Sequence, residues 1–174
     1  MNGDTLLVAM RPPVAAAAVV GRGTFKIAPT LKRFGLAALD AGCSRLILDM
    51  SRCVGMDSTF MGVAGGLALR FRRERNGEVA LVRLSAKNRA LLQTLGLDRS
   101  LRLEEGEGEL ASFSEPLQPA SLVGTDQIAL TKTMLAAHQT LADISPENRE
   151  KFKDVLAYLD EDARRQSGPS GSNE

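Results

Sequence analysis

The fold of this chain is decided by residues 46–71, which read LILDMSRCVGMDSTFMGVAGGLALRF. The unbroken apolar run Leu46–Leu48 predicts a central strand that is buried on both faces of a sheet. The residues between Met50 and Asp57 predict a short exposed loop. Beyond Gly55, apolar residues recur at the spacing of an α-helix, so we expect a helix to begin near Asp57.

The first turn of this expected helix contains Asp57, Ser58 and Thr59. Short side chains with oxygen atoms are favoured there because they accept hydrogen bonds from backbone N–H groups that have no helical partner. The helix dipole also favours negative charge, so a phosphate group on Ser58 would lie in a stabilising field. The residues alone leave two interpretations open: Ser58 is a phosphate acceptor, or it only caps the helix.

A resemblance to a known family rests on several segments, which are, in chain order, Leu48–Ser51, Met56–Thr59, Gly62 and Leu67 on the following helix, Glu78–Leu84 and Leu91–Asp98. Together they resemble the STAS domain of anti-sigma-factor antagonists over about residues 5–104. The resemblance implies an α/β fold, with a STAS-like mixed, mostly parallel sheet of four to five strands and packed helices. A helical extension is expected to follow at the C-terminus.

The resemblance also implies a function. An antagonist of this family binds an anti-sigma-factor serine kinase and so frees a sigma factor; the kinase phosphorylates the antagonist, and a phosphatase restores it. Ser58 is the expected phosphorylation site. The residues expected to bind the partner are Lys26, Met56, Asp57, Ser58, Thr59 and Met61. Lys26 departs from the family, whose members usually carry an acidic residue in that turn, so we expect the kinase-facing surface to differ.

A second class of function stays open because of the C-terminal extension: an oligomeric scaffold or sensory-complex subunit in which Ser58 tunes assembly. We do not expect an enzyme, a cofactor or a metal site. His138 is the only histidine, and a Ser58–His138–Asp triad would need the extension to reach the Ser58 loop. No nucleotide-binding loop or catalytic cluster is visible.

The chain divides into four parts by composition and pattern. We expect a STAS domain over residues 1–104, an acidic and irregular linker over 105–124, a helical extension over 125–165 and a disordered tail over 166–174. The apolar stripes of the extension must be buried, either on the domain or in a homodimer seam formed by the C-terminal helices.

Charge changes sign near the end of the expected domain. Residues 1–103 carry 16 Lys+Arg and 7 Asp+Glu, a net charge of +9, whereas residues 104–174 carry 6 and 14, a net charge of −8. These parts could be two solvated surfaces of opposite sign. Alternatively, the acidic part docks on the basic domain, in its own chain or in a dimer partner, or attracts a basic partner.

The sequence favours a soluble cytoplasmic protein. No apolar run is long enough to span a membrane, and the N-terminus lacks the pattern of a secretory signal. Cys43 and Cys53 lack metal-site spacing and are expected to be free thiols. Scattered arginines and few aromatic residues, 4% of the chain, argue against direct binding of nucleic acid.

Overall fold

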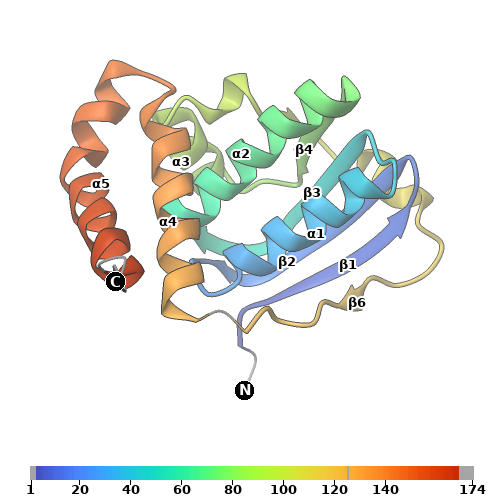
Figure 1. The fold of residues 1–174 in the computed structure, drawn as a ribbon. Coiled ribbons are helices and arrows are strands. Elements are labelled where there is room, and N and C mark those ends of the chain that lie inside the picture. Colours follow the sequence, from blue (N-terminus) through green and yellow to red (C-terminus); the bar gives the residue numbers. More distant parts are fainter. Residues whose placement is uncertain (1–2, 125, 169–174) are drawn as a thin grey trace.

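The computed structural model describes residues 3–124 and 126–168, which form one sheet with helices packed against it (Figure 1). The strands are β1 (Thr5–Arg11), β2 (Val14–Gly23), β3 (Arg45–Met56), β4 (Glu78–Val82), β5 (Arg102–Glu104) and β6 (Gln118–Pro119). The α-helices are α1 (Ala28–Asp40), α2 (Ser58–Arg75), α3 (Ala86–Thr94), α4 (Gln127–Ala142) and α5 (Pro146–Ser167). Short 3-10 helices cover Leu97–Arg99 and Gly108–Ser112.

The sheet has the strand order β5-β4-β3-β2-β1-β6. The pairs β2–β3, β3–β4 and β4–β5 are parallel, whereas β1 is antiparallel to both β2 and β6. Parallel neighbours require crossover connections, which α1, α2 and α3 supply. The expected α/β fold with a mixed, mostly parallel sheet is confirmed. The sheet has one strand more than expected because β6, from the predicted irregular linker, pairs with β1.

Strand β3 is longer than the sequence pattern predicts. The expected exposed loop after Met50 is wrong, because the strand continues through Met56. Strand β2 extends to Gly23 and supplies a parallel partner for this part of β3, with register shifts that interrupt the pairing. Cys53 and Met56 are consequently buried. Helix α2 therefore starts directly at the carboxyl end of a central strand.

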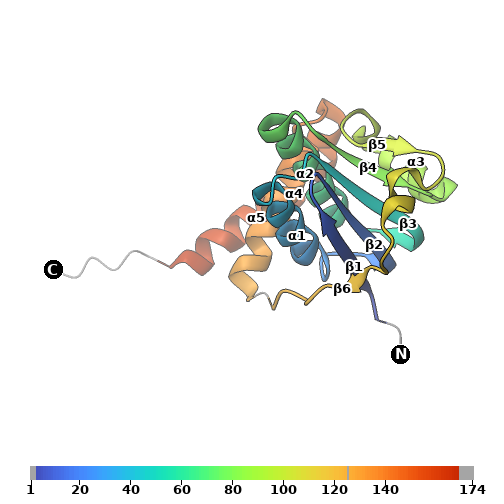
Figure 2. The ribbon, with the colours of Figure 1, turned by 90° about the vertical axis from the view of Figure 1, so that its right-hand side faces the viewer.

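The main core lies between the sheet and helices α1 and α2. Figure 2 separates the layers: these helices cover one side of the sheet, and the segment between β5 and β6 crosses the other side. Cys43 and Cys53 are free and buried, as expected, and burial raises the pKa of both thiols. Within the described ranges, no helix has the length and apolar character needed to cross a membrane.

The start of the acidic segment docks on basic residues of the same chain. Its ion pairs are Glu104–Arg45 at 2.8 Å, Glu105–Arg89 at 3.0 Å, Glu107–Arg83 at 2.9 Å and Glu109–Arg45 at 3.7 Å. The opposite charges found in the sequence thus meet within the chain at this segment. The Glu104–Arg45 pair is mostly buried, whereas Glu105, Glu107 and Glu109 are exposed. Exposed ion pairs contribute little individually, so the main effect of these three glutamates is to set the path of the segment.

The segment then runs beneath α1 toward the C-terminal helices. The Ala120 N–H donates to the Leu6 carbonyl at 2.8 Å, which prolongs the contact with β1. The Val123 N–H donates to Thr30 Oγ1 at 3.1 Å. These bonds bring the chain to the start of α4 on the side of the sheet that carries α1 and α2 (Figure 1).

Helix α4 packs directly on α2, and α5 packs on α4. A Cβ atom on Gly62 would lie 2.4 Å from the Ala137 carbonyl oxygen, so the two helices touch through backbone. Asn148, 2% exposed at the start of α5, donates from Nδ2 to the carbonyls of Leu95 and Leu141, both at 2.9 Å. The alternative in which the extension packs on its own domain is therefore realised.

The apolar stripes of these helices are not all covered in the single chain. Leu141 and Phe152 are buried, whereas Ile128 is exposed. Met134, Leu135 and Leu156 are half-buried. Helix α5 ends at Ser167, inside the expected tail over 166–174; of that tail, 169–174 lies outside the described residues.

An ion pair links the buried Asp49 of β3 to the half-buried Arg83, the residue that follows β4. Asp49, 4% exposed on β3, accepts from Arg83 Nε at 3.0 Å and from Arg83 Nη2 at 2.5 Å. Burial alone would raise the pKa of the Asp49 carboxyl, but hydrogen bonds from Arg83 and from Ser51 outweigh it and hold that pKa below its usual range. Arg83 has a positive φ of 57°, so this pair also supports an uncommon backbone conformation.

We expect Asp49→Asn to lower the free energy of unfolding by about 2 kcal/mol at neutral pH, because it leaves a partly buried guanidinium without its carboxylate. A depressed carboxyl pKa stabilises the fold above the unfolded-state value of about 3.9 and loses this effect as the pH falls through the folded-state value. Urea denaturation at pH 7 and pH 3 should show the difference shrinking in acid. Glu107→Gln is the matched control; an Asp49→Asn effect no larger than the control would contradict the assignment.

Candidate functional site

Asp57 fixes the geometry around the start of α2. As the N-cap, its Oδ1 accepts from the Phe60 N–H at 2.8 Å, and its Oδ2 accepts from the Phe25 N–H at 2.8 Å. The Asp57 N–H donates to the Gly23 carbonyl at 2.9 Å. One carboxylate therefore fastens both the first turn of α2 and the turn that precedes α1. The residue that caps α2 is thus Asp57, and Ser58 is the residue after it.

Ser58 is the first residue of α2 and is half-buried. Its Oγ lies 2.8 Å from Nε2 of His138, a residue of α4 that is 3% exposed. His138 Nδ1 lies 2.7 Å from the Met134 carbonyl oxygen. Because a carbonyl oxygen only accepts, Nδ1 carries the hydrogen; in the neutral ring Nε2 then accepts, and the Ser58 hydroxyl donates to it.

The extension does bring His138 to Ser58, which is the approach that a Ser58–His138–Asp triad would need. Helix α4 lies on α2 through the close contact at Gly62, and His138 is the residue after Ala137 in that contact. A catalytic triad is not complete, because His138 Nδ1 is hydrogen-bonded to a backbone carbonyl and not to a carboxylate. His138 is thus hydrogen-bonded to the Ser58 hydroxyl, but it lacks the carboxylate that in a catalytic triad orients the imidazole and stabilises its charged form.

Helix α5 supports the histidine. The ring of Phe152 meets the His138 ring edge to face, with centroids 5.5 Å apart. Such aromatic contacts stabilise one ring orientation, and the imidazole is therefore held between α2 and α5. In the part of the chain that the structure describes, no group of three or more His, Cys, Asp or Glu side chains is arranged to hold a metal ion.

The other residues expected to bind a partner lie in different surroundings. Met56, Thr59 and Met61 are buried, at 8%, 3% and 5% exposure. Asp57 is half-buried and occupied by its two backbone hydrogen bonds. Lys26 is exposed, in the turn whose Phe25 N–H reaches Asp57. The structure thus brings the turn of Lys26 beside the first turn of α2, which begins at Ser58. A role of these residues in partner binding stays a prediction.

Ser58 and His138 were considered together only as parts of a triad that we did not expect, and their contact was not predicted from the sequence. One signal was present: His138 lies four residues after Met134 and three before Leu141, so it belongs to the apolar face of its helix. A lone histidine on such a face is most simply a buried, hydrogen-bonded residue. The pattern says nothing about which residue, 80 positions earlier, it contacts.

Comparisons with known proteins agree with this fold. A family model for the STAS domain matches residues 3–110, and no curated protein matches the sequence. The Bacillus anti-sigma factor antagonist SpoIIAA, in its unphosphorylated form, is 18% identical with a TM-score of 0.54, over 62% of this chain and 92% of SpoIIAA. An antagonist from Mycobacterium paratuberculosis is 19% identical with a TM-score of 0.54, over 65% and 96%. The Thermotoga maritima protein TM1081 is 20% identical with a TM-score of 0.53, over 60% and 89%.

Each match covers most of the solved structure, 89–96% of its length, whereas more than a third of this chain lies outside it. The family match ends at residue 110, before α4 and α5 begin. The strand that precedes Ser58, the helix that Ser58 begins and the crossover units around them lie within the matched part. The chain belongs to the STAS domain family.

Proposed function

We propose that this chain is a regulatory binding protein of the anti-sigma-factor-antagonist type and not an enzyme, with Ser58 as the phosphate acceptor of a partner serine kinase and a phosphatase as the reversing partner. The observation that carries the proposal is the placement of Ser58 as the first residue of α2, directly after a central strand. A phosphate there would face the N-terminal end of the helix dipole. SpoIIAA, one of the similar structures, is known in unphosphorylated and phosphorylated forms.

The C-terminal helices add a further element to this proposal. The Ser58 hydroxyl is occupied by a buried histidine, and a kinase must surround that hydroxyl to transfer a phosphoryl group. Helix α4 therefore has to leave α2 before Ser58 reacts. In this proposal α4 and α5 are an intramolecular cap, which competes with the partner for the surface around Ser58.

The cap makes partner binding a competition between two states of the chain. A partner that binds only the uncapped state loses affinity in proportion to the rarity of that state. Each tenfold reduction in the uncapped population costs about 1.4 kcal/mol of apparent binding free energy. Substitutions that weaken the α2–α4 contact should therefore expose Ser58 and strengthen partner binding together.

Access to position 58 can be measured without the kinase. In a Ser58→Cys variant, we expect Gly62→Ala to speed alkylation by iodoacetamide at least about tenfold, because its methyl group would overlap the Ala137 carbonyl and detach α4. Cys43 and Cys53 are buried with raised pKa values and should react slowly.

Gly66→Ala is the matched control for this experiment. It adds the same methyl group to the same helix, but its nearest neighbour, Thr140 Oγ1, would lie at an ordinary 3.6 Å. Equal alkylation rates in the Gly62→Ala and Gly66→Ala backgrounds would show that α4 does not restrict access to position 58.

The phosphorylation switch is tested by partner binding. The wild type, Ser58→Ala and Ser58→Asp serve as baits in pull-downs from a lysate of the source organism, and bound proteins are identified by mass spectrometry. We expect a serine kinase of the anti-sigma-factor class among them. With that kinase purified, titration calorimetry should show binding to Ser58→Asp weakened about 10²-fold, since an unpaired charge in a packed interface costs several kcal/mol, and binding to Ser58→Ala retained. Equal affinities for the two variants would rule out Ser58 as the switch.

A scaffold function remains the second candidate, and exposed apolar residues on α5 favour it. Val155 and Tyr158, 37% and 61% exposed, are three positions apart and so share one face of the helix. A homodimer through the C-terminal helices would cover such a face.

For the scaffold candidate, light scattering of the wild type should give the mass of a dimer or larger assembly. Tyr158→Glu should reduce that mass to one chain of 18.6 kDa. A wild type that is monomeric at high protein concentration would exclude self-assembly through this face.

A further inference from the structure

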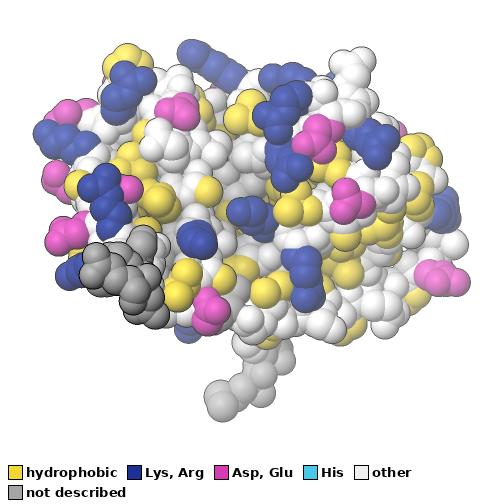
Figure 3. Space-filling view, viewed as in Figure 1, with side chains coloured by type: hydrophobic (Ala, Val, Ile, Leu, Met, Phe, Trp, Pro, Cys, Tyr) yellow, Lys and Arg dark blue, Asp and Glu magenta, His cyan; other side chains and the backbone are white. Residues whose placement is uncertain are grey.

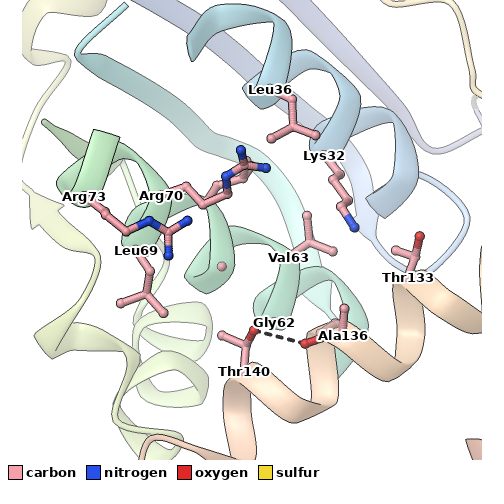
Figure 4. A pocket seen from close by; sticks show the side chains of 13 residues that line it. Lys32, Leu36, Gly62, Val63, Leu69, Arg70, Arg73, Thr133, Ala136 and Thr140 are labelled. Carbon is pink, nitrogen blue, oxygen red and sulfur yellow. Dashed lines mark hydrogen bonds between the residues drawn. The ribbon is translucent and has the colours of Figure 1, made fainter. Parts of the chain in front are cut away.

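A cavity of about 310 Å³ lies where α1, α2 and α4 meet. Figure 3 shows a hollow on this face of the molecule, with Lys and Arg side chains at its border, and Figure 4 shows the side chains that line it. The volume falls at the lower end of the range of about 300–1,000 Å³ that is usual for small-molecule sites. It is separate from the Ser58–His138 pair, although α4 contributes to both.

Two close contacts keep this cavity from collapsing. The contact at Gly62 already places α4 in backbone contact with α2. On the other side, a Cβ atom on Gly35 of α1 would lie 2.6 Å from Leu67 of α2, so these helices are also at their closest approach. Because neither α1 nor α4 can move nearer to α2, the space between the three helices is a property of the fold.

The border of the cavity is cationic. Lys32 comes from α1, and Arg70 and Arg73 come from α2. Arg70 and Arg73 share one carboxylate, that of Glu74, which lies 2.8 Å from Arg70 and 3.7 Å from Arg73. This carboxylate offsets two of the three cations, which leaves an excess of positive charge beside a partly enclosed space.

Lys32 is the cation that points into the space. It is half-buried, and among the residues that the structure describes it forms no ion pair. Figure 4 shows its side chain reaching from α1 toward α4, with the ammonium group beside Val63 and Thr133. A half-buried ammonium group loses hydration, and a bound anion would offset that loss.

The rest of the lining is largely apolar. Leu36, Val63 and Leu67 supply side chains from α1 and α2, and Ala136 closes the α4 side. Thr140 Oγ1 donates to the Ala136 carbonyl at 3.0 Å, so this hydroxyl is already bonded within α4. An apolar wall with a few cations at its border fits a ligand that has a charged end and a hydrocarbon body.

We propose that this cavity binds a small amphipathic anion, with a carboxylate or phosphate group on Lys32 and the two arginines and an apolar body against Leu36 and Val63. The ligand would touch α1, α2 and α4 at once, and it would bind only while α4 is docked. It therefore stabilises the capped state of Ser58, a consequence that rests on the proposed function. Such a ligand links a small-molecule signal to the availability of the switch residue.

Octanoate and octyl phosphate are suitable probes. Their binding to the full chain can be monitored through the amide chemical shifts in two-dimensional NMR spectra. Both should bind saturably and shift amides of α1, α2 and α4. Octanol tests the apolar body without charge, and inorganic phosphate tests charge without the apolar body; both should bind at least about tenfold more weakly. The better of the two anionic probes identifies the preferred head group.

Two variants test the site itself. Lys32→Met should weaken octanoate binding about tenfold, while Lys87→Met, which removes an exposed lysine of α3, should leave it unchanged. Ala136→Leu should also weaken binding, because it fills the cavity from an exposed position that tolerates a larger side chain. Octanol binding as tightly as octanoate, Lys32→Met behaving like Lys87→Met, or shifts outside these three helices would overturn the proposal.

The coupling between ligand binding in the cavity and docking of α4 is measured separately. Amide hydrogen exchange of α4 reports it, and no kinase is needed. Octanoate at the concentration that half-saturates the wild type should slow exchange of the α4 amides in the wild type, and it should slow them much less in Lys32→Met, which binds about tenfold more weakly. Unchanged α4 exchange in the octanoate-bound wild type would overturn the coupling. Failure of the Ser58 switch in the kinase experiment would not alter octanoate binding, so the two proposals fail independently.

Discussion

The backbone contact between α2 and α4 at Gly62 is the constraint on which the functional surface depends. Any side chain at this position would meet Ala137, so only glycine allows α4 to lie directly on α2. The next residue of α4 is His138, which thereby reaches Ser58. The same contact fixes the distance of α4 from α2 and, together with the contact of Gly35 on α1 with Leu67 on α2, maintains the cationic cavity. One missing side chain thus determines both how Ser58 is covered and where a small ligand could act.

The described part of the extension is joined to the domain at several points and is more than a tethered pair of helices. Glutamates at the end of β5 and after it pair with arginines of the domain, β6 adds to the sheet edge, and Asn148 bonds the carbonyls of Leu95 and Leu141. These contacts hold α4 near α2 at high effective concentration. An external partner that uses the same surface must therefore compete with a segment that is always nearby, which favours regulation through weakening of the cap.

The electrostatics of the two sites differ in kind. At Ser58 a hydroxyl group is hydrogen-bonded to a buried imidazole, whose other nitrogen bonds a backbone carbonyl. At the cavity, excess positive charge borders an apolar space. A phosphoryl group would introduce charge at the first site and disturb the packing there, whereas an anion would complete the second. The proposed modification and the proposed ligand therefore act on α4 in opposite directions.

Much of the fold was determined by features that act over a few residues and can be read directly from the sequence. The apolar run of β3, the caps at Asp57 and Ser85 and the glycine at position 96 with its positive φ all reflect local backbone requirements. They sufficed to place Ser58 at the start of a helix within an α/β fold. The extension of β3 to Met56, the pairing of β6 and the bond between His138 and Ser58 were decided by tertiary structure. Each depends on a partner distant in the chain, and for His138 on an interhelical approach that a single Cβ atom would prevent.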